Sequence, residues 1–186
     1  MNPKSEEILI VDDKPANLKL LAQVLAGQGY GVRAASSGKH ALESVRVSPP
    51  NLILLDIKMP EMNGYEVCES LKVDELTRDI PVIFISALDD LQEKVRGFRV
   101  GGVDYITKPF QVEEVLARVE THLGLRRLQK QLQDTNVRMA RELQLAALTQ
   151  ANFLPHELPL VDGWQMSATL IPARETSGDF YDVFCL

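Results

Sequence analysis

Residues 52–56 read LILLD, four apolar residues without a polar break that end at an acidic residue, Asp56. Two other runs have the same character, ILIV at residues 8–11 and VIFI at residues 82–85. A strand with one face in solvent alternates apolar and polar residues, whereas a strand buried on both faces does not. These three runs therefore predict central strands of a parallel sheet.

Segments of helical length and apolar period separate these runs. Two weaker strand-like runs complete the series, at residues 30–35 and 103–106. Helices are predicted over residues 15–27, 38–47, 64–73 and 90–100. The fourth helix is expected to begin with a capping box formed by Asp90 and Glu93. Strands that alternate with helices favour an α/β fold with a five-stranded, doubly wound parallel sheet.

Composition excludes several classes of protein. The chain has 186 residues and a formal net charge of −6, which leaves no basic surface suited to nucleic acid or an anionic membrane. The apolar run near the N-terminus is too short for a signal peptide or a membrane span. His40, His122 and His156 lack metal-ligand spacing and are expected at the surface or in linkers. We expect a soluble cytoplasmic protein with no nucleic-acid or membrane partner.

Polar side chains follow four of the five predicted strands. In chain order they are Asp12, Asp13, Asp56, Ser86 and Lys108. The carboxyl ends of parallel strands meet at one edge of the sheet, and ligands of such sheets bind there. We therefore expect these side chains to form one active site.

The residue types at this edge suit phosphoryl transfer. Carboxylates that share one pocket repel one another unless a cation binds, and Mg²⁺ prefers oxygen ligands of this kind. An aspartate can accept a phosphoryl group and form an acyl phosphate. The cation, an ammonium and a hydroxyl would then share the charge on the phosphoryl oxygens. Lys108 and Ser86 supply the last two groups.

Four motifs resemble those of the receiver domain of two-component response regulators over about residues 6–123. They are ILIVDDKPAN, LILLDIKMPEMNGYEV, VIFISA and GGVDYITKPF, in this order. The resemblance implies a flavodoxin-like fold and a place in a phosphorelay. It also implies that Asp56 accepts a phosphoryl group from a histidine kinase or a phosphotransfer protein, a reaction that the receiver itself catalyses.

The same resemblance implies the ligands of Mg²⁺. Asp13 and Asp56 would bind the ion directly, the backbone carbonyl of Lys58 would complete the protein ligands, and Asp12 would belong to the acidic pocket. An aspartate-nucleophile hydrolase is the rival class. It needs a second aspartate two residues after the nucleophile, where this chain has Lys58, so the sequence argues against it.

Further roles follow from the resemblance. Lys108 would pair with the phosphoryl group, and Pro109 would follow a cis peptide bond that aims the lysine. Ser86 and Tyr105 match a switch pair, in which the hydroxyl moves to the phosphate and the aromatic ring turns inward. The receiver domain is assigned to residues 1–123.

Residues 111–154 contain no proline and a single glycine, Gly124, which predicts one long helix with a candidate hinge. Beyond Gly124 an apolar stripe recurs mostly at steps of three and four. It consists of Leu125, Leu128, Leu132, Thr135, Met139, Leu143 and Ala146. A narrow stripe on a protruding helix predicts a coiled-coil linker over residues 124–152 and a homodimer. The alternative is a single helix folded back on its own receiver.

The last stretch, residues 153–186, resembles the start of the sporulation- and stress-type metal-dependent protein phosphatases, the type 2C class. It holds a predicted strand over residues 164–173, followed by TSGDFYD at residues 176–182. The resemblance implies that Asp179 is a ligand of Mn²⁺ or Mg²⁺, although Ser177 replaces the first glycine of the motif. The later Asp-Gly motifs of that family are absent. We therefore expect a fragment of a second α/β domain without a complete phosphatase site, cut from a longer protein.

These observations favour a response regulator whose phosphorylation controls an attached protein serine/threonine phosphatase and, through it, a phosphoprotein substrate. The alternative is a receiver-adaptor whose phosphatase-like output is catalytically inactive and captures a partner protein.

Overall fold

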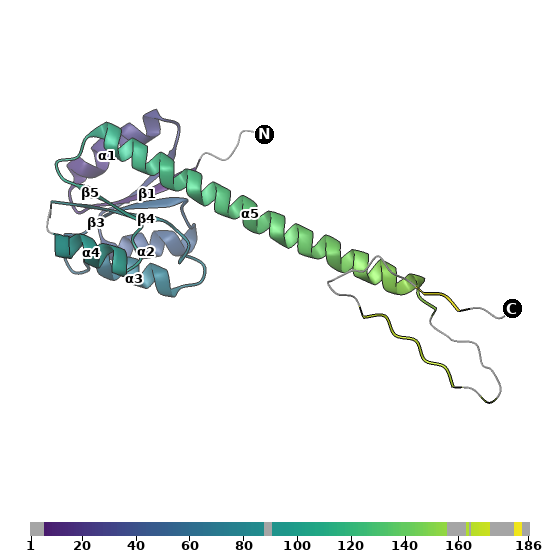
Figure 1. Ribbon diagram of the computed structural model, residues 1–186. Helices are drawn as coiled ribbons and strands as arrows, with labels where there is room; N and C mark the ends of the chain where they lie inside the picture. Colours follow the sequence, from purple (N-terminus) through teal and green to yellow (C-terminus); the bar gives the residue numbers. More distant parts are fainter. Residues whose placement is uncertain (1–5, 88–90, 156–162, 164, 172–180, 184–186) are drawn as a thin grey trace. The chain divides into compact units, whose positions relative to one another are not determined.

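The computed structural model describes residues 6–87, 91–155, 163, 165–171 and 181–183. Its sheet has five parallel strands in the order β2-β1-β3-β4-β5 (Figure 1). The strands are β1 Glu7–Val11, β2 Gly31–Ala35, β3 Leu52–Asp56, β4 Val82–Ser86 and β5 Asp104–Thr107. The predicted α/β fold with a doubly wound parallel sheet is confirmed.

Five helices alternate with these strands within the described residues. They are α1 Pro15–Gly27, α2 Gly38–Val47, α3 Gly64–Val73, α4 Leu91–Arg99 and α5 Val112–Phe153. The first three match the predicted ranges at both ends, and α4 is one residue shorter at each end. Asp90 of the expected capping box lies outside the described residues. A capping box is found instead on α3, where Asn63 and Glu66 satisfy each other's backbone N–H groups.

The sheet is buried on both faces because helices cover each of them. Figure 1 shows α1 and α5 on one face and α2, α3 and α4 on the other. Successive residues of a strand therefore point into different cores. In β1, Ile8 and Ile10 pack with residues of α1 and α5, while Leu9 and Val11 pack with residues of α2 and α3. This double burial explains why the strand sequences do not alternate.

The strand order reverses at the pair β1 and β3. The chain runs from β1 outward to β2, and then returns to place β3 on the other side of β1. Val11 is level with Leu55 in this pair, so Asp12 and Asp56 leave the sheet side by side. A ligand site is expected at such a reversal.

The chain divides into two compact units, residues 1–128 and 129–186. Helix α5 continues through Gly124 without a break, and a Cβ atom on Gly124 would meet only the Arg127 side chain, at 3.7 Å. Within the first unit, Arg126 donates hydrogen bonds to the carbonyls of Pro50 and Asn51. Contacts between α5 and the sheet domain thus extend beyond Gly124.

The strand predicted over residues 164–173 is not found where the structure describes this segment. Residues 165–171 have no regular secondary structure, and the remaining residues of the range lie outside the description. A strand needs a neighbouring strand to satisfy its backbone groups, and no described segment pairs with this one. The apolar pattern of this segment was therefore not sufficient to predict a strand. In the described part of the chain, no helix combines the length and apolar character needed to span a membrane.

The first turn of α3 packs directly on the backbone of the acidic strand end. A Cβ atom on Gly64 would lie 2.4 Å from the carbonyl oxygen of Asp56 and 2.9 Å from Cα of Ile57. The Gly64 N–H donates to the Ile57 carbonyl at 2.9 Å. Gly64 is therefore required because the backbone of α3 approaches the backbone of Asp56 and Ile57 too closely for any side chain at this position.

We expect Gly64→Ala to lower the free energy of unfolding by about 1–3 kcal/mol, because the added methyl group forces two backbone segments apart. Gly27→Ala is the matched control, since nothing lies within 4 Å of a Cβ atom there. It should change stability by no more than about 1 kcal/mol. Urea unfolding of both variants measures the difference, and equal midpoints would contradict the packing argument.

Candidate active site at the carboxyl edge of the sheet

Three carboxylates meet at this edge, as the sequence predicted. Asp12 and Asp13 follow β1 and Asp56 ends β3, and each offers an oxygen within 4.8 Å of the others. Asp12 and Asp56 are 2% and 5% exposed, so water compensates little of their charge. Carboxylates this close oppose one another's ionisation unless cations are present.

Lys108 supplies a cation to this cluster from the end of β5. Its Nζ atom lies 2.8 Å from Oδ2 of Asp12 and 3.1 Å from Oδ1 of Asp56. The Lys108 backbone N–H donates to the Ser86 carbonyl at 2.8 Å, which fixes the lysine beside β4. The Lys108–Pro109 peptide bond is cis, as the resemblance implied.

Asp12 is held by groups that the sequence analysis did not single out. The Lys14 backbone N–H donates to its Oδ1 atom at 2.9 Å, and Nδ2 of Asn17 lies 3.0 and 2.8 Å from its two oxygens. With Lys108, these donors surround the carboxylate. Asn17 is the last residue of the first motif and lies in the first turn of α1, a position from which its role could have been inferred.

Asp13, unlike Asp12, has a carboxylate oxygen without a hydrogen-bond donor in the part of the chain that the structure describes. Its Oδ1 atom is buried and has no hydrogen-bond partner among the described residues. A buried carboxylate oxygen without a donor is unfavourable, and a cation removes that penalty. Three clustered carboxylates with one oxygen left unpaired fit Mg²⁺, which takes oxygen ligands and retains several waters.

Burial and charge act in opposite directions on the titrating groups. Burial raises the pKa of the Asp56 carboxyl above its ordinary value, and the nearby Lys108 ammonium only partly opposes this. Burial lowers the pKa of Lys108, but hydrogen bonds and charge from Asp12 and Asp56 outweigh it and raise the pKa. The lysine therefore stays charged, and one ammonium contacts two of the three clustered carboxylates.

The remaining predicted residues lie around this cluster. Ser86 ends β4 and is fully buried, while Tyr105 in β5 is 7% exposed with the Lys94 ammonium 5.6 Å from its ring centroid. Lys58 has an exposed side chain and lines an open pocket of about 530 Å³ beside Asp13. Asp179, the candidate metal ligand of the last stretch, lies outside the described residues.

The sequence model described as "Response regulator receiver domain" matches residues 8–120. This chain belongs to that family. Receiver domains act in two-component signalling, bind Mg²⁺ at an acidic pocket, and interact with histidine kinases or phosphotransfer proteins. The aspartate cluster at the strand ends is the acidic pocket of this receiver.

Two curated relatives match over the receiver. A protein of Vibrio cholerae named "Probable cyclic di-GMP phosphodiesterase" is 47% identical over 120 residues, 64% of this chain and 27% of that protein. The "DNA-binding dual master transcriptional regulator RpaA" of Synechocystis is 45% identical over 116 residues, 62% of this chain and 48% of that protein. The chain therefore spans about half or less of the length of these relatives.

Solved structures agree with the receiver fold. A CheY-like response regulator receiver domain protein from Methanospirillum hungatei has a TM-score of 0.64 and 30% identity, covering 67% of this chain and 98% of its own. The signal receiver domain of a histidine kinase from Syntrophus aciditrophicus has a TM-score of 0.61 and 36% identity, covering 64% and 91%. The family model ends at residue 120, so the receiver assignment does not reach the last stretch.

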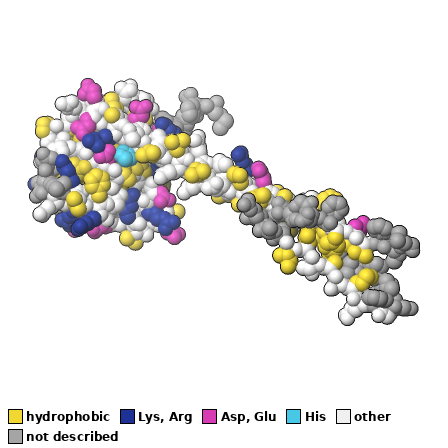
Figure 2. Space-filling view, viewed as in Figure 1, with side chains coloured by type: hydrophobic (Ala, Val, Ile, Leu, Met, Phe, Trp, Pro, Cys, Tyr) yellow, Lys and Arg dark blue, Asp and Glu magenta, His cyan; other side chains and the backbone are white. Residues whose placement is uncertain are grey.

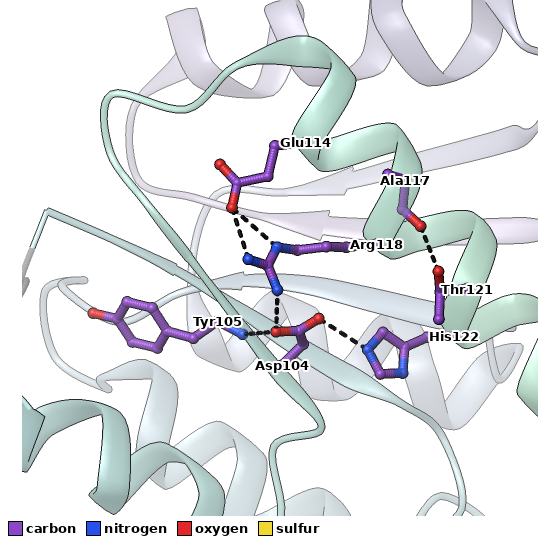
Figure 3. Close-up of polar contacts among 7 residues, drawn as sticks. All are labelled: Asp104, Tyr105, Glu114, Ala117, Arg118, Thr121 and His122. Atoms are coloured by element: carbon purple, nitrogen blue, oxygen red, sulfur yellow. Dashed lines mark hydrogen bonds and ion pairs between the residues drawn. The ribbon is translucent and has the colours of Figure 1, made fainter.

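A second polar cluster joins α5 to β5 of the receiver (Figure 3). Asp104 lies 2.6 Å from Arg118 Nη1 and 3.0 Å from His122 Nε2, and Arg118 also pairs with Glu114 at 2.8 Å. Burial tends to raise the pKa of Asp104, but hydrogen bonds from Arg118, the Tyr105 backbone and His122 outweigh it and lower the pKa. His122, expected at the surface or in a linker, is half-buried and lies against a carboxylate. The spacing of residues in the sequence does not reveal that Asp104 contacts Arg118 and His122.

We expect Asp13→Asn to stabilise the metal-free protein, because one of the repelling carboxylates is removed. The free energy of unfolding should rise by up to about 1 kcal/mol, and the melting temperature should rise with it. Addition of Mg²⁺ should stabilise the wild type, since a ligand that binds the folded state shifts unfolding by mass action. Asp13→Asn should lose most of that gain. Thermal melts with and without Mg²⁺ measure both effects.

Glu43→Gln is the control for Asp13→Asn, since it removes one negative charge from an exposed position of α2. It should keep the full response to Mg²⁺. An equal Mg²⁺ response in Asp13→Asn and the wild type would remove Asp13 from the metal site.

Proposed function

We propose that Asp56 is the phosphoryl acceptor of this receiver and that the donor is a phosphohistidine on a histidine kinase or a phosphotransfer protein. The observation that carries the proposal is the position of Asp56, which is buried, clustered with Asp12 and Asp13, and has the Lys108 ammonium 3.1 Å from its Oδ1 atom. A desolvated carboxylate next to a fixed cation is suited to attack on phosphorus.

In the proposed transfer an oxygen of Asp56 forms a bond to phosphorus as the bond to the donor's imidazole nitrogen breaks. Lys108 exchanges its contact with the Asp56 carboxylate for one with a phosphoryl oxygen. Asp13, Asp56 and the Lys58 carbonyl would hold Mg²⁺, with Asp12 beside them. The ion, when bound, supplies positive charge that offsets the charge of the phosphoryl oxygens.

We further propose that Ser86 and Tyr105 report the modification. Ser86 ends the strand beside β3 and follows Ile85, the residue level with Asp56, so its hydroxyl would turn toward a phosphoryl group on Asp56. That movement would empty space at the end of β4, and the Tyr105 ring on the adjacent strand, which is already only 7% exposed, would shift to fill it. The face formed by α4, β5 and the start of α5 would change as a result.

We expect a small phosphodonor with Mg²⁺ to label the protein once, at Asp56. Asp56→Asn should abolish the label, because an amide is a poor nucleophile and forms no acyl phosphate. Asp134→Asn, an exposed aspartate of α5, is the control and should be labelled like the wild type. Mass spectrometry of the intact protein gives the count. Persistent labelling of Asp56→Asn would refute the assignment.

A homodimer through the helix over residues 124–152 is the second part of the proposal. The apolar stripe on α5 is exposed, as Figure 2 shows for hydrophobic side chains along this helix. The exposed fractions are 51% for Leu125, 64% for Leu128, 63% for Leu132, 53% for Met139 and 40% for Leu143. Large apolar side chains at this spacing are those that a parallel pair of helices buries. A second copy of the chain is the partner that this stripe fits.

We expect the wild type to sediment as a dimer and Leu132→Glu to weaken the dimer by at least tenfold, because a carboxylate in the seam must be desolvated. Gln133→Glu adds the same charge one residue away from the stripe and should leave the dimer intact. Sedimentation equilibrium across a range of concentrations compares the three proteins. A monomeric wild type at every concentration would exclude the coiled-coil dimer.

The output is proposed from sequence alone. The TSGDFYD motif with Asp179 supports a metal-dependent protein serine/threonine phosphatase that begins at about residue 153 and binds Mn²⁺ or Mg²⁺ when complete. The named relatives carry other outputs, so this motif is the sole support. The alternative is an inactive phosphatase-like adaptor. The coding sequence downstream of residue 186 discriminates between them, since an active phosphatase requires the later Asp-Gly motifs.

A further inference from the structure

Helix α4 is attached to α3 through one buried tyrosine. The Tyr65 hydroxyl donates to Oε2 of Glu93 at 2.8 Å and also lies 3.0 Å from the Glu93 carbonyl oxygen. The guanidinium of Arg96 stacks over the same ring, 4.5 Å from its centroid. Two side chains on successive turns of α4 thus hold a single ring that belongs to α3.

The Tyr65 ring has little freedom to follow α4 if that helix moves. It is 3% exposed, and its centroid lies 5.3 Å from that of Phe84 in β4. Its backbone N–H donates to Oδ1 of Asn63 at 2.9 Å. The preceding residue, Gly64, packs on the Asp56 carbonyl. Tyr65 is therefore fixed to the strand end that carries Asp56.

The attachment also lies next to the acidic cluster. Tyr65, Glu93 and Arg96 line the same open pocket as Asp13 and Lys58. A shift of α4 would therefore change the wall of the pocket beside the proposed phosphorylation site. Tyr65 cannot keep its hydrogen bond to Glu93 through such a shift, because the ring is held by β4 and by the start of α3.

The hydrogen bond is of a strong type. The donor is a buried hydroxyl and the acceptor a carboxylate, and charge-assisted hydrogen bonds exceed neutral ones in strength. Burial is the first cause, and the hydrogen bond to Glu93 the second, of a pKa of Tyr65 far above its ordinary value. The phenol therefore remains a donor across the physiological range.

Helix α4 is in contact with the second tyrosine of this region as well. The Lys94 ammonium lies 5.6 Å from the centroid of the Tyr105 ring. If the Tyr105 ring shifts after phosphorylation, the environment of Lys94 changes, while Tyr65 still holds Glu93 and Arg96. The contact with Tyr65 then opposes a movement of α4 that the Tyr105 shift favours.

We propose that Tyr65 is a positioning residue that holds α4 in the arrangement of the unphosphorylated receiver, so that the Tyr65–Glu93 hydrogen bond sets how readily Asp56 is phosphorylated. The inference rests on the proposed function of Asp56 and names a regulatory contact of that same site. A contact made in one of two states shifts their equilibrium by its own free energy. Its removal must then favour the phosphorylated arrangement.

Tyr65→Phe in the full chain is the decisive variant, because it removes the hydroxyl and keeps the ring against Phe84. We expect about a tenfold gain in apparent affinity for beryllofluoride, an analogue of the phosphoryl group, and a faster rate of labelling by a small phosphodonor. Glu93→Gln keeps an acceptor and should give a smaller gain. Tyr30→Phe is the matched control on the opposite face of the sheet, and should match the wild type.

Hydrogen exchange separates this role from a merely structural one. In Tyr65→Phe, residues 91–99 should exchange faster than in the wild type before modification, and equally with it once beryllofluoride is bound. Unchanged or weaker beryllofluoride affinity in Tyr65→Phe, with Glu93→Gln also at the wild-type value, would overturn the inference. Labelling that survives Asp56→Asn would instead overturn the proposed function, so the two failures are distinguishable.

Discussion

The contact of one ammonium with two of three clustered carboxylates is the interaction on which this receiver depends. Lys108 contacts Asp12 and Asp56 at once, yet an oxygen of Asp13 is left buried and unpaired. A site that is short of positive charge has affinity for Mg²⁺ and for a group that brings new partners to Lys108. Mutual repulsion of these carboxylates opposes the folded state when no further cation is bound. The affinity of the site for Mg²⁺ and the repulsion within the metal-free cluster therefore have the same electrostatic cause.

The rest of the fold brings these charges together and keeps them there. The reversal of strand order between β1 and β3 places Asp12 level with Asp56, and the backbone of Gly64 packs on the carbonyl behind Asp56. Asn17 and the Lys14 N–H surround Asp12 with donors, so its charge is compensated without a metal. Asp12 and Asp13 are neighbours in sequence but differ in this respect, which suits them to different roles around the ion.

Helix α5 has two parts with different surroundings. Up to Arg127 it contacts the receiver, through the apolar residues Val115, Val119 and Leu123 and through Arg126 at the start of β3. Beyond Leu128 its apolar side chains are exposed. The Asp104 cluster ties the first part to β5, directly beside Tyr105. A change at β5 therefore has a physical connection to the first part of α5.

Most of the fold was predictable from local pattern. The three unbroken apolar runs located β1, β3 and β4, because double burial suppresses alternation. Two weaker runs located β2 and β5, and the helix periods with their end signals located the ends of α1, α2 and α3. The strand predicted over residues 164–173 was wrong for residues 165–171, because a strand depends on a partner that local pattern does not reveal. The contact of His122 with Asp104 was not predicted for a similar reason, since the tertiary fold brings the two residues together.

The sequence by itself determined which residues stand at the strand ends, and hence the acidic cluster with Lys108 and Ser86. Residue type and position along a strand are local properties, and the parallel sheet gathers them at one edge. Only the tertiary structure decided which carboxylate is satisfied and which is not, that Asn17 supports Asp12, and that Tyr65 joins α4 to the strand end of Asp56. These contacts depend on side-chain direction across elements distant in the chain, and residue spacing carries no information about that direction.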